Sequence, residues 1–199
     1  MTYELHGSPR SRAFRVIWML EELGADYTHV NTPPRSPEIL ALNPLGKVPV
    51  LKFGDTAITD STAILTYLAD AHGALTFPAG TLERAQQDSH TQFILDEIDS
   101  LIWQVARHSF GLPEELRVPA VKDSARQEFL ISTDRLSARL QKSGGPFLMG
   151  DTMTIADIIA VHCLGWSMVA KFPKLPDELQ AYLKSLRSRD AYQRAQATG

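Results

Sequence analysis

The stretch NPLGKVPVLKFGDTAITDSTAILTYL, residues 43–68, decides the fold of this chain. Residues 48–53 alternate in the manner of a strand. A Gly-Asp turn follows, so residues 56–59 are expected to return as the antiparallel partner strand. The pair Asp60-Ser61 then precedes a run with apolar residues at helical spacing. The stretch therefore predicts two paired strands followed by a helix.

The segment before this stretch alternates strand-like and helix-like patterns. Residues 2–6 predict a strand, and apolar residues at helical spacing predict a helix over 13–23 that Gly24 ends. Residues 25–32 predict a second strand, after which Pro33-Pro34 begins an irregular joint. The expected order is β-α-β, an irregular joint and β-β-α.

From about residue 83 onward only helical spacing remains. A segment with Gly and Pro around Phe77-Pro78 separates the two regions and reads as a linker. We therefore expect an α/β domain over residues 1–76, a linker over 77–83 and an all-α domain over 84–199.

Composition and charge limit the classes of function. Of the 199 residues, 44% are apolar and 22% are charged, as in ordinary globular proteins. The net charge of −3 argues against nucleic acid as a partner. The sequence contains no apolar run of about 18 residues, so no membrane span is expected. The N-terminus lacks the pattern of a secretory signal peptide. Cys163 is the single cysteine, which excludes an intramolecular disulfide and argues against a cysteine-based metal site. A cytoplasmic protein without membrane or nucleic-acid binding is expected.

Two serines flank a Pro-Arg pair in Ser8-Pro9-Arg10-Ser11, where the first predicted strand gives way to the first predicted helix. Serine is a frequent helix cap, because its hydroxyl accepts a hydrogen bond from a free backbone N–H. A hydroxyl at such a place can also donate to a ligand. From the residues alone, both interpretations stay open.

The segments NPLGKVPVL and ITDSTAILTYL, residues 43–51 and 58–68, resemble the N-terminal domain of soluble, cytosolic-type glutathione transferases. The likeness continues to the end of the chain. GDTMTIADIIA, residues 150–160, contains the capping box Thr154-x-x-Asp157, and SLRSRDAYQRA resembles the closing helix of the family. The resemblance implies a thioredoxin-like α/β domain, an all-α second domain and a cis peptide bond before Pro49. The serine-containing turn resembles that of bacterial, serine-type members.

The resemblance also implies a glutathione site in the first domain. The backbone of Val48 would pair with the tripeptide as an added strand does. Asp60, where the family usually has Glu, would meet the ammonium group of the γ-glutamyl end, and Ser61 at a helix start would meet its carboxylate. A plain helix cap is the alternative for this pair. The residues expected to bind glutathione are Arg35, Lys47, Val48, Pro49, Asp60 and Ser61.

In thioredoxins the turn that matches Ser8-Pro9-Arg10-Ser11 is Cys-Pro-x-Cys. A serine hydroxyl cannot exchange disulfides, but it can hold the sulfur of glutathione as a thiolate. The resemblance favours Ser8 for this role, with Ser11 as a cap or an assistant. Side chains of the second domain line the electrophile pocket in this family. The candidates for that pocket are Arg10, Trp103, Arg107 and Phe110.

The resemblance therefore implies an enzyme of detoxification that joins glutathione to a small hydrophobic electrophile, or uses glutathione to reduce a peroxide. It further implies a homodimer, with glutathione as co-substrate and no metal. Two alternatives stay open. One is a non-catalytic binding or regulatory protein of the same fold, and the other is a glutathione-dependent isomerase or dehalogenase.

Overall fold

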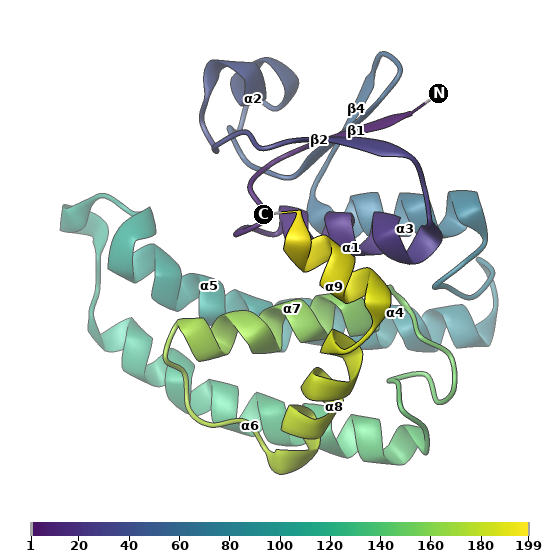
Figure 1. The fold of residues 1–199 in the computed structure, drawn as a ribbon. Helices are drawn as coiled ribbons and strands as arrows, with labels where there is room; N and C mark the ends of the chain where they lie inside the picture. Colours follow the sequence, from purple (N-terminus) through teal and green to yellow (C-terminus); the bar gives the residue numbers. More distant parts are fainter. Residues whose placement is uncertain (1, 199) are drawn as a thin grey trace. The chain divides into compact units, whose positions relative to one another are not determined.

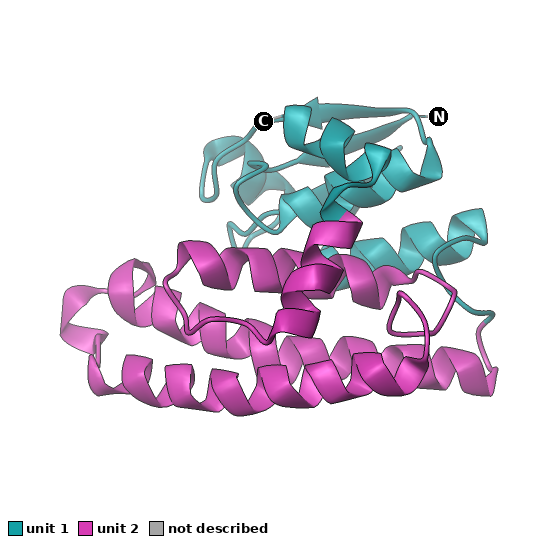
Figure 2. Ribbon diagram, turned by 60° about the horizontal axis from the view of Figure 1, so that its bottom comes forward, with its two compact units in different colours: residues 1–78, 187–199 teal, residues 79–186 magenta. Residues whose placement is uncertain are grey.

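The computed structural model describes residues 2–198 of the chain (Figure 1). Contacts divide them into two compact units, residues 2–78 with 187–198 and residues 79–186 (Figure 2). The last helix therefore groups by its contacts with the N-terminal residues, although the sequence stretch 84–199 reads as one helical domain. The domain limits given above stay a prediction.

A four-stranded sheet forms the centre of the first unit. Its strands, in the order β2-β1-β3-β4, are β1 (Tyr3–His6), β2 (Tyr27–Val30), β3 (Val50–Phe53) and β4 (Thr56–Thr59). Strand β1 pairs parallel with β2 and antiparallel with β3, and β3 pairs antiparallel with β4. Helices α1 (Ala13–Leu23) and α3 (Ser61–His72) cover one face, and the short helix α2 (Pro37–Leu42) lies on the other side (Figure 1). The predicted thioredoxin-like α/β fold is confirmed.

The ends of the helices in this unit follow local sequence rules. Gly24 ends α1 with a φ of 59°, the left-handed conformation that glycine adopts readily. Helix α2 lies in the region that the sequence predicted as an irregular joint. Its signal is nevertheless present, because the Ser36 hydroxyl accepts a hydrogen bond from the Ile39 N–H at 3.3 Å and Pro37 occupies the first helical position.

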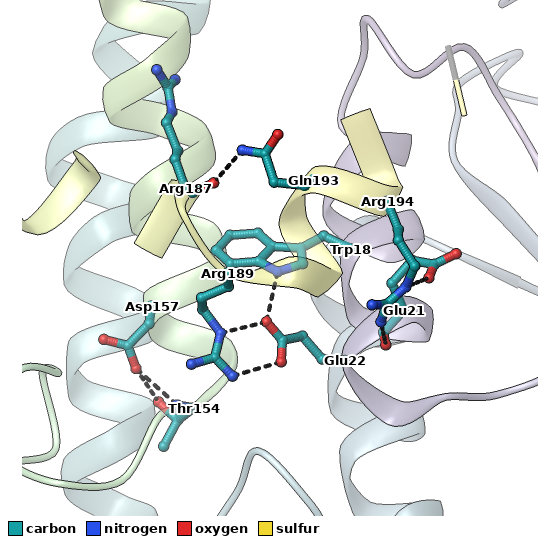
Figure 3. Close-up of polar contacts among 9 residues, drawn as sticks. All are labelled: Trp18, Glu21, Glu22, Thr154, Asp157, Arg187, Arg189, Gln193 and Arg194. Atoms are coloured by element: carbon teal, nitrogen blue, oxygen red, sulfur yellow. Dashed lines mark hydrogen bonds and ion pairs between the residues drawn. The ribbon is translucent and has the colours of Figure 1, made fainter. Parts of the chain in front are cut away.

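Helix α9 (Asp190–Ala197) packs on α1 and joins the last residues of the chain to the first unit. The Glu22 carboxylate accepts two hydrogen bonds from the Arg189 guanidinium, at 2.6 and 2.8 Å, and one from the Trp18 indole at 2.9 Å (Figure 3). Arg194 donates to Glu21 at 2.7 Å beside them. Two-point contacts between arginine and a carboxylate fix orientation, so these bonds fix the approach of α9 to α1.

The second unit is helical, which confirms the all-α expectation for this part of the chain. Its helices are α4 (Leu82–Ile94), η1 (Leu95–Asp99), α5 (Ser100–Ala106), η2 (Arg107–Gly111), η3 (Glu114–Leu116), α6 (Ala120–Ser143), α7 (Ile155–Val169) and α8 (Asp177–Arg187), of which η1 and η2 are π-helical and η3 is a 3-10 helix. Among the described residues, no helix combines the length and apolarity needed to cross a membrane.

The predicted capping box is present at the start of α7. The Asp157 carboxylate is fully buried and accepts a hydrogen bond from the backbone N–H of Thr154 at 2.8 Å (Figure 3). It also accepts bonds from the Leu148 N–H at 2.9 Å and from the Tyr182 hydroxyl at 2.7 Å. One side chain thus ties together the start of α7, the loop before it and α8.

Candidate glutathione site

The pairing of the strands brings three predicted site segments to one edge of the sheet. His6 at the end of β1 pairs with Val50 at the start of β3, and Val50 pairs with Thr59 at the end of β4. Strand β1 ends at His6, two residues before Ser8, and β4 ends at Thr59, directly before Asp60. Strand β3 begins at Val50, two residues after Val48. Residues 7–8, 48–49 and 60–61 therefore lie at the same edge.

In the turn between β1 and α1, the Ser11 side chain is occupied by the backbone. Its hydroxyl donates to the Ser8 carbonyl at 2.6 Å and accepts a hydrogen bond from the Ala13 N–H at 3.1 Å. The Ser11 backbone N–H donates to the same carbonyl at 2.9 Å. Ser11 therefore serves the start of α1 as a cap.

The Ser8 side chain is placed differently. Its half-buried hydroxyl oxygen accepts a hydrogen bond from the Arg10 N–H at 3.3 Å. Among the described residues, the structure gives its proton no acceptor. The Ser8 hydroxyl is thus able to donate to a ligand, whereas Ser11 would first have to release the Ser8 carbonyl.

Gly7 allows this turn to lie against the segment before β3. A Cβ atom at Gly7 would stand 2.9 Å from the Ala13 Cβ and 3.1 Å from the Val48 Cβ, and the φ of 138° does not suit a larger residue. Its backbone is held on both sides, since its N–H donates to the Val30 carbonyl at 3.1 Å and His29 contacts its carbonyl at 2.7 Å. Sequence reasoning missed Gly7, although a glycine between a strand and a turn is a signal of close approach.

We expect Gly7→Ala to lower the free energy of unfolding by about 2–3 kcal/mol, because the added methyl overpacks a held backbone. Chemical denaturation of both proteins measures this loss. Gly54→Ala is the control, since Gly54 also has a positive φ, 58°, but no atom within 4 Å of the added Cβ. It should cost only about 1 kcal/mol from backbone strain. Equal losses in the two variants would contradict the close-approach argument.

The predicted cis peptide bond is present between Val48 and Pro49. Val48 lies before β3 begins, and within residues 2–198 its N–H and C=O have no hydrogen-bond partner. The loop is held from behind by the buried Asn43, whose side-chain amide donates to the Lys47 carbonyl at 2.9 Å. Asn43 is a supporting residue that sequence reasoning did not single out. The Val48 backbone remains available to an extended ligand.

Arg35 and Lys47 lie on backbone segments that are joined by a hydrogen bond. The Arg35 N–H donates to the Gly46 carbonyl at 2.9 Å, directly before Lys47, and Arg35 has a φ of 65°. Both side chains are exposed. Two cations beside one loop suit a ligand carboxylate.

Asp60 caps α3, yet its backbone is not that of an ordinary cap. Its carboxylate accepts hydrogen bonds from the N–H groups of Thr62 and Ala63 at 2.8 and 3.2 Å. Its φ is 73°, whereas N-cap residues normally have extended backbones. Ser61 is 2% exposed, and its hydroxyl accepts a hydrogen bond from the buried Arg15 at 3.3 Å. Strained non-glycine residues cluster at functional sites, so capping alone does not account for this pair.

The candidates for an electrophile pocket lie in both units. Arg10 is exposed in the first unit. Trp103 is half-buried in α5, with its ring centroid 6.4 Å from that of Trp166, and Arg107 and Phe110 are exposed in η2. Within residues 2–198, no group of three or more His, Cys, Asp or Glu side chains is arranged to hold a metal ion. The pocket stays a prediction.

Known proteins are similar to this chain over most of its length. Sequence models of the glutathione S-transferase N-terminal and C-terminal domains match residues 3–76 and 102–193. Glutathione S-transferase 1 of Dianthus caryophyllus is 30% identical over 165 residues, which cover 75% of this chain and 70% of that protein. A solved glutathione transferase of Methylococcus capsulatus has a TM-score of 0.84 and 29% identity, with 99% of this chain and 98% of that one covered. A theta class glutathione S-transferase of Xanthomonas axonopodis pv. citri, solved with glutathione bound, has a TM-score of 0.80 and 28% identity, with 98% and 96% covered. Since both domain models match in order and these likenesses span most of the chain, it belongs to the glutathione S-transferase family.

Proposed function

We propose that this chain is a glutathione transferase of the serine type, which joins the sulfur of glutathione to small hydrophobic electrophiles. The observation that carries the proposal is the row His6–Val50–Thr59, which brings the Ser8 hydroxyl, the Val48 backbone and the Asp60-Ser61 pair to one edge of the sheet. The hydroxyl can donate a hydrogen bond to a thiolate, and the backbone can pair with an extended peptide. The Asp60-Ser61 pair can bind the ammonium and carboxylate groups of an amino acid. Glutathione presents the matching groups in the same order: sulfur, peptide backbone and γ-glutamyl zwitterion.

In this proposal the Ser8 hydroxyl donates a hydrogen bond to the sulfur and favours the thiolate over the thiol. A free cysteine thiol has a pKa of about 8.5, and each unit of depression is worth about 1.36 kcal/mol. A bound thiol with a pKa of ~6.5 therefore needs about 3 kcal/mol, within reach of a charge-assisted hydrogen bond aided by the start of α1. The thiolate then forms a C–S bond to the electrophile as the leaving group departs with its electron pair, and the proton of the thiol goes to solvent.

Asp60→Asn tests the binding part of this proposal. Asparagine keeps the capping oxygen and tolerates a positive φ, so the substitution removes mainly the charge. We expect the Kd for glutathione to rise about tenfold, as for the loss of a charged hydrogen bond, while kcat at saturating glutathione changes little. Calorimetry and turnover of a generic aryl halide measure the two quantities.

The control for this test is Asp55→Asn, since Asp55 is an exposed aspartate in the turn between β3 and β4. It should leave both quantities unchanged. A fall in kcat at saturating glutathione in Asp60→Asn would remove the ammonium role from Asp60. Binding of glutathione by the wild type without turnover of any aryl halide or peroxide would favour the non-catalytic alternative, and turnover that regenerates glutathione would favour the isomerase alternative.

The proposal also covers the oligomeric state, the cellular location and the remaining binding residues. We infer a homodimer and a cytoplasmic location, which are consistent with the family membership, together with a bacterial type and no need for a metal. Arg35 and Lys47 are proposed to meet the glycine carboxylate of glutathione. Arg10, Trp103, Arg107 and Phe110 are proposed to contribute to electrophile binding.

A further inference from the structure

A fully buried arginine of α1 reaches the first residue of α3. Arg15 is 0% exposed, and its neighbours along α1, Phe14 and Val16, are buried as well. The Arg15 Nη1 donates a hydrogen bond to the Ser61 hydroxyl oxygen at 3.3 Å. A guanidinium group cannot lose its proton in a protein, and burying its charge is unfavourable. A fixed positive charge therefore stands directly behind the start of α3.

The backbone N–H groups at the start of α3 fall into two sets: those bonded to Asp60 and those left for a ligand. The Asp60 carboxylate takes the N–H groups of Thr62 and Ala63. Ser61 is the first helical residue, so its own N–H and hydroxyl are the groups left for an anion from outside.

The hydrogen bond from Arg15 determines whether the Ser61 hydroxyl donates or accepts toward a ligand. Because Arg15 donates to the oxygen, the hydroxyl proton cannot point back at the guanidinium and must be donated elsewhere. A hydroxyl that accepts from a cation is also a stronger donor, since linked hydrogen bonds polarise one another. Arg15 thus converts Ser61 from a residue that either donates or accepts into one that donates.

We propose that Arg15 is a positioning residue for glutathione binding. It aims the Ser61 hydroxyl at the γ-glutamyl α-carboxylate and places a permanent positive charge behind that bond. This inference rests on the proposed function and adds to it a residue that does not touch the ligand. A purely structural Arg15, which only ties α1 to α3, would support every ligand of the site equally.

The test compares glutathione with its analogue 4-aminobutanoyl-cysteinylglycine, which lacks only the α-carboxylate. Arg15→Met should raise the Kd for glutathione about tenfold and the Kd for the analogue less than twofold, with kcat at saturating glutathione within threefold of the wild type. Arg15→Lys, which retains a charge but not the planar fork, should give an intermediate loss for glutathione alone. Lys52→Met, at a half-buried lysine of β3, is the charge-removal control and should affect neither Kd.

Ser61→Ala provides the second arm of the test. In this background Arg15→Met should raise the Kd for glutathione by much less than tenfold, because the route through the hydroxyl is gone and only the charge of Arg15 still acts on the carboxylate. Equal losses for the two ligands, or a full loss from Arg15→Met in the Ser61→Ala background, would overturn the inference. Failure of the wild type to bind glutathione would instead overturn the proposed function.

A third arm needs no variant, in case the Arg15 substitutions unfold the protein. Buried guanidinium protons exchange slowly with water, so the ¹⁵N signals of Arg15 are observable in the wild type. They should shift when glutathione is added and stay in place when the analogue is added. Signals that move equally with both ligands, or with neither, would contradict the positioning role.

Discussion

Ser8→Ala is expected to raise the pKa of glutathione bound to the enzyme by about 2, from ~6.5 toward the free value of ~8.5. The rate of aryl-halide conjugation at pH ~6.5 should then fall about 50-fold, because the fraction of thiolate falls from about one half to about one hundredth. The Kd for glutathione should change little, since the substitution leaves the proposed contacts of the tripeptide at Val48 and Asp60 in place. Ultraviolet titration of bound glutathione measures the pKa directly, and stopped-flow conjugation measures the rate.

The matched control for this prediction is Ser11→Ala. The Ser11 hydroxyl holds the Ser8 carbonyl and accepts from the Ala13 N–H, so its loss should cost about 1 kcal/mol of stability as a lost cap. Its effect on the pKa of bound glutathione should be small. If Ser11→Ala rather than Ser8→Ala raised this pKa, the Ser11 hydroxyl would be the donor to the glutathione sulfur, and the geometry of the turn would change on binding.

The fold could be predicted from the sequence where local rules decide it. Strands β3 and β4 have a regular alternation and a Gly-Asp turn, α1 ends at Gly24 as expected, and Thr154 and Asp157 stand at capping-box spacing. Helix α2 carried a Ser-Pro signal but lies among prolines that also indicate a loop. Local patterns therefore predicted elements better than they predicted the segments between them.

The candidate site could be predicted only in part, because several of its supporting contacts join residues far apart in sequence. The bond between Arg15 and Ser61 spans 46 positions, and the approach of Gly7 to Val48 depends on the pairing of β1 with β3. An arginine on the apolar face of a helix gives no local sign of its partner. The division of roles between Ser8 and Ser11 likewise depends on which hydroxyl the backbone occupies.

Asp157→Ala is expected to lower the free energy of unfolding by about 3–5 kcal/mol. The substitution leaves the buried donors of Leu148, Thr154 and Tyr182 without their acceptor, and each such group costs about 1–3 kcal/mol. Asp151→Ala is the control, since Asp151 is an exposed aspartate in the preceding loop and should cost little. The Kd for glutathione should stay unchanged in folded Asp157→Ala, and a stable variant that no longer binds or turns over glutathione would contradict a folding role.

The pH dependence of Asp157→Asn tests the cause of this effect. Burial raises the pKa of the Asp157 carboxyl above its ordinary value of 3.8, although hydrogen bonds from Leu148, Thr154 and Tyr182 oppose the shift. Between the ordinary pKa and the raised folded pKa, the unfolded carboxyl has lost its proton while the folded one still holds it, so the contribution of this group to stability falls as pH rises through the folded pKa. Asparagine does not titrate. The advantage of wild type over Asp157→Asn in free energy of unfolding should therefore be largest near pH 4 and shrink toward pH 7, and an advantage that grows with pH would mean that hydrogen bonding to the ionised carboxylate outweighs its burial.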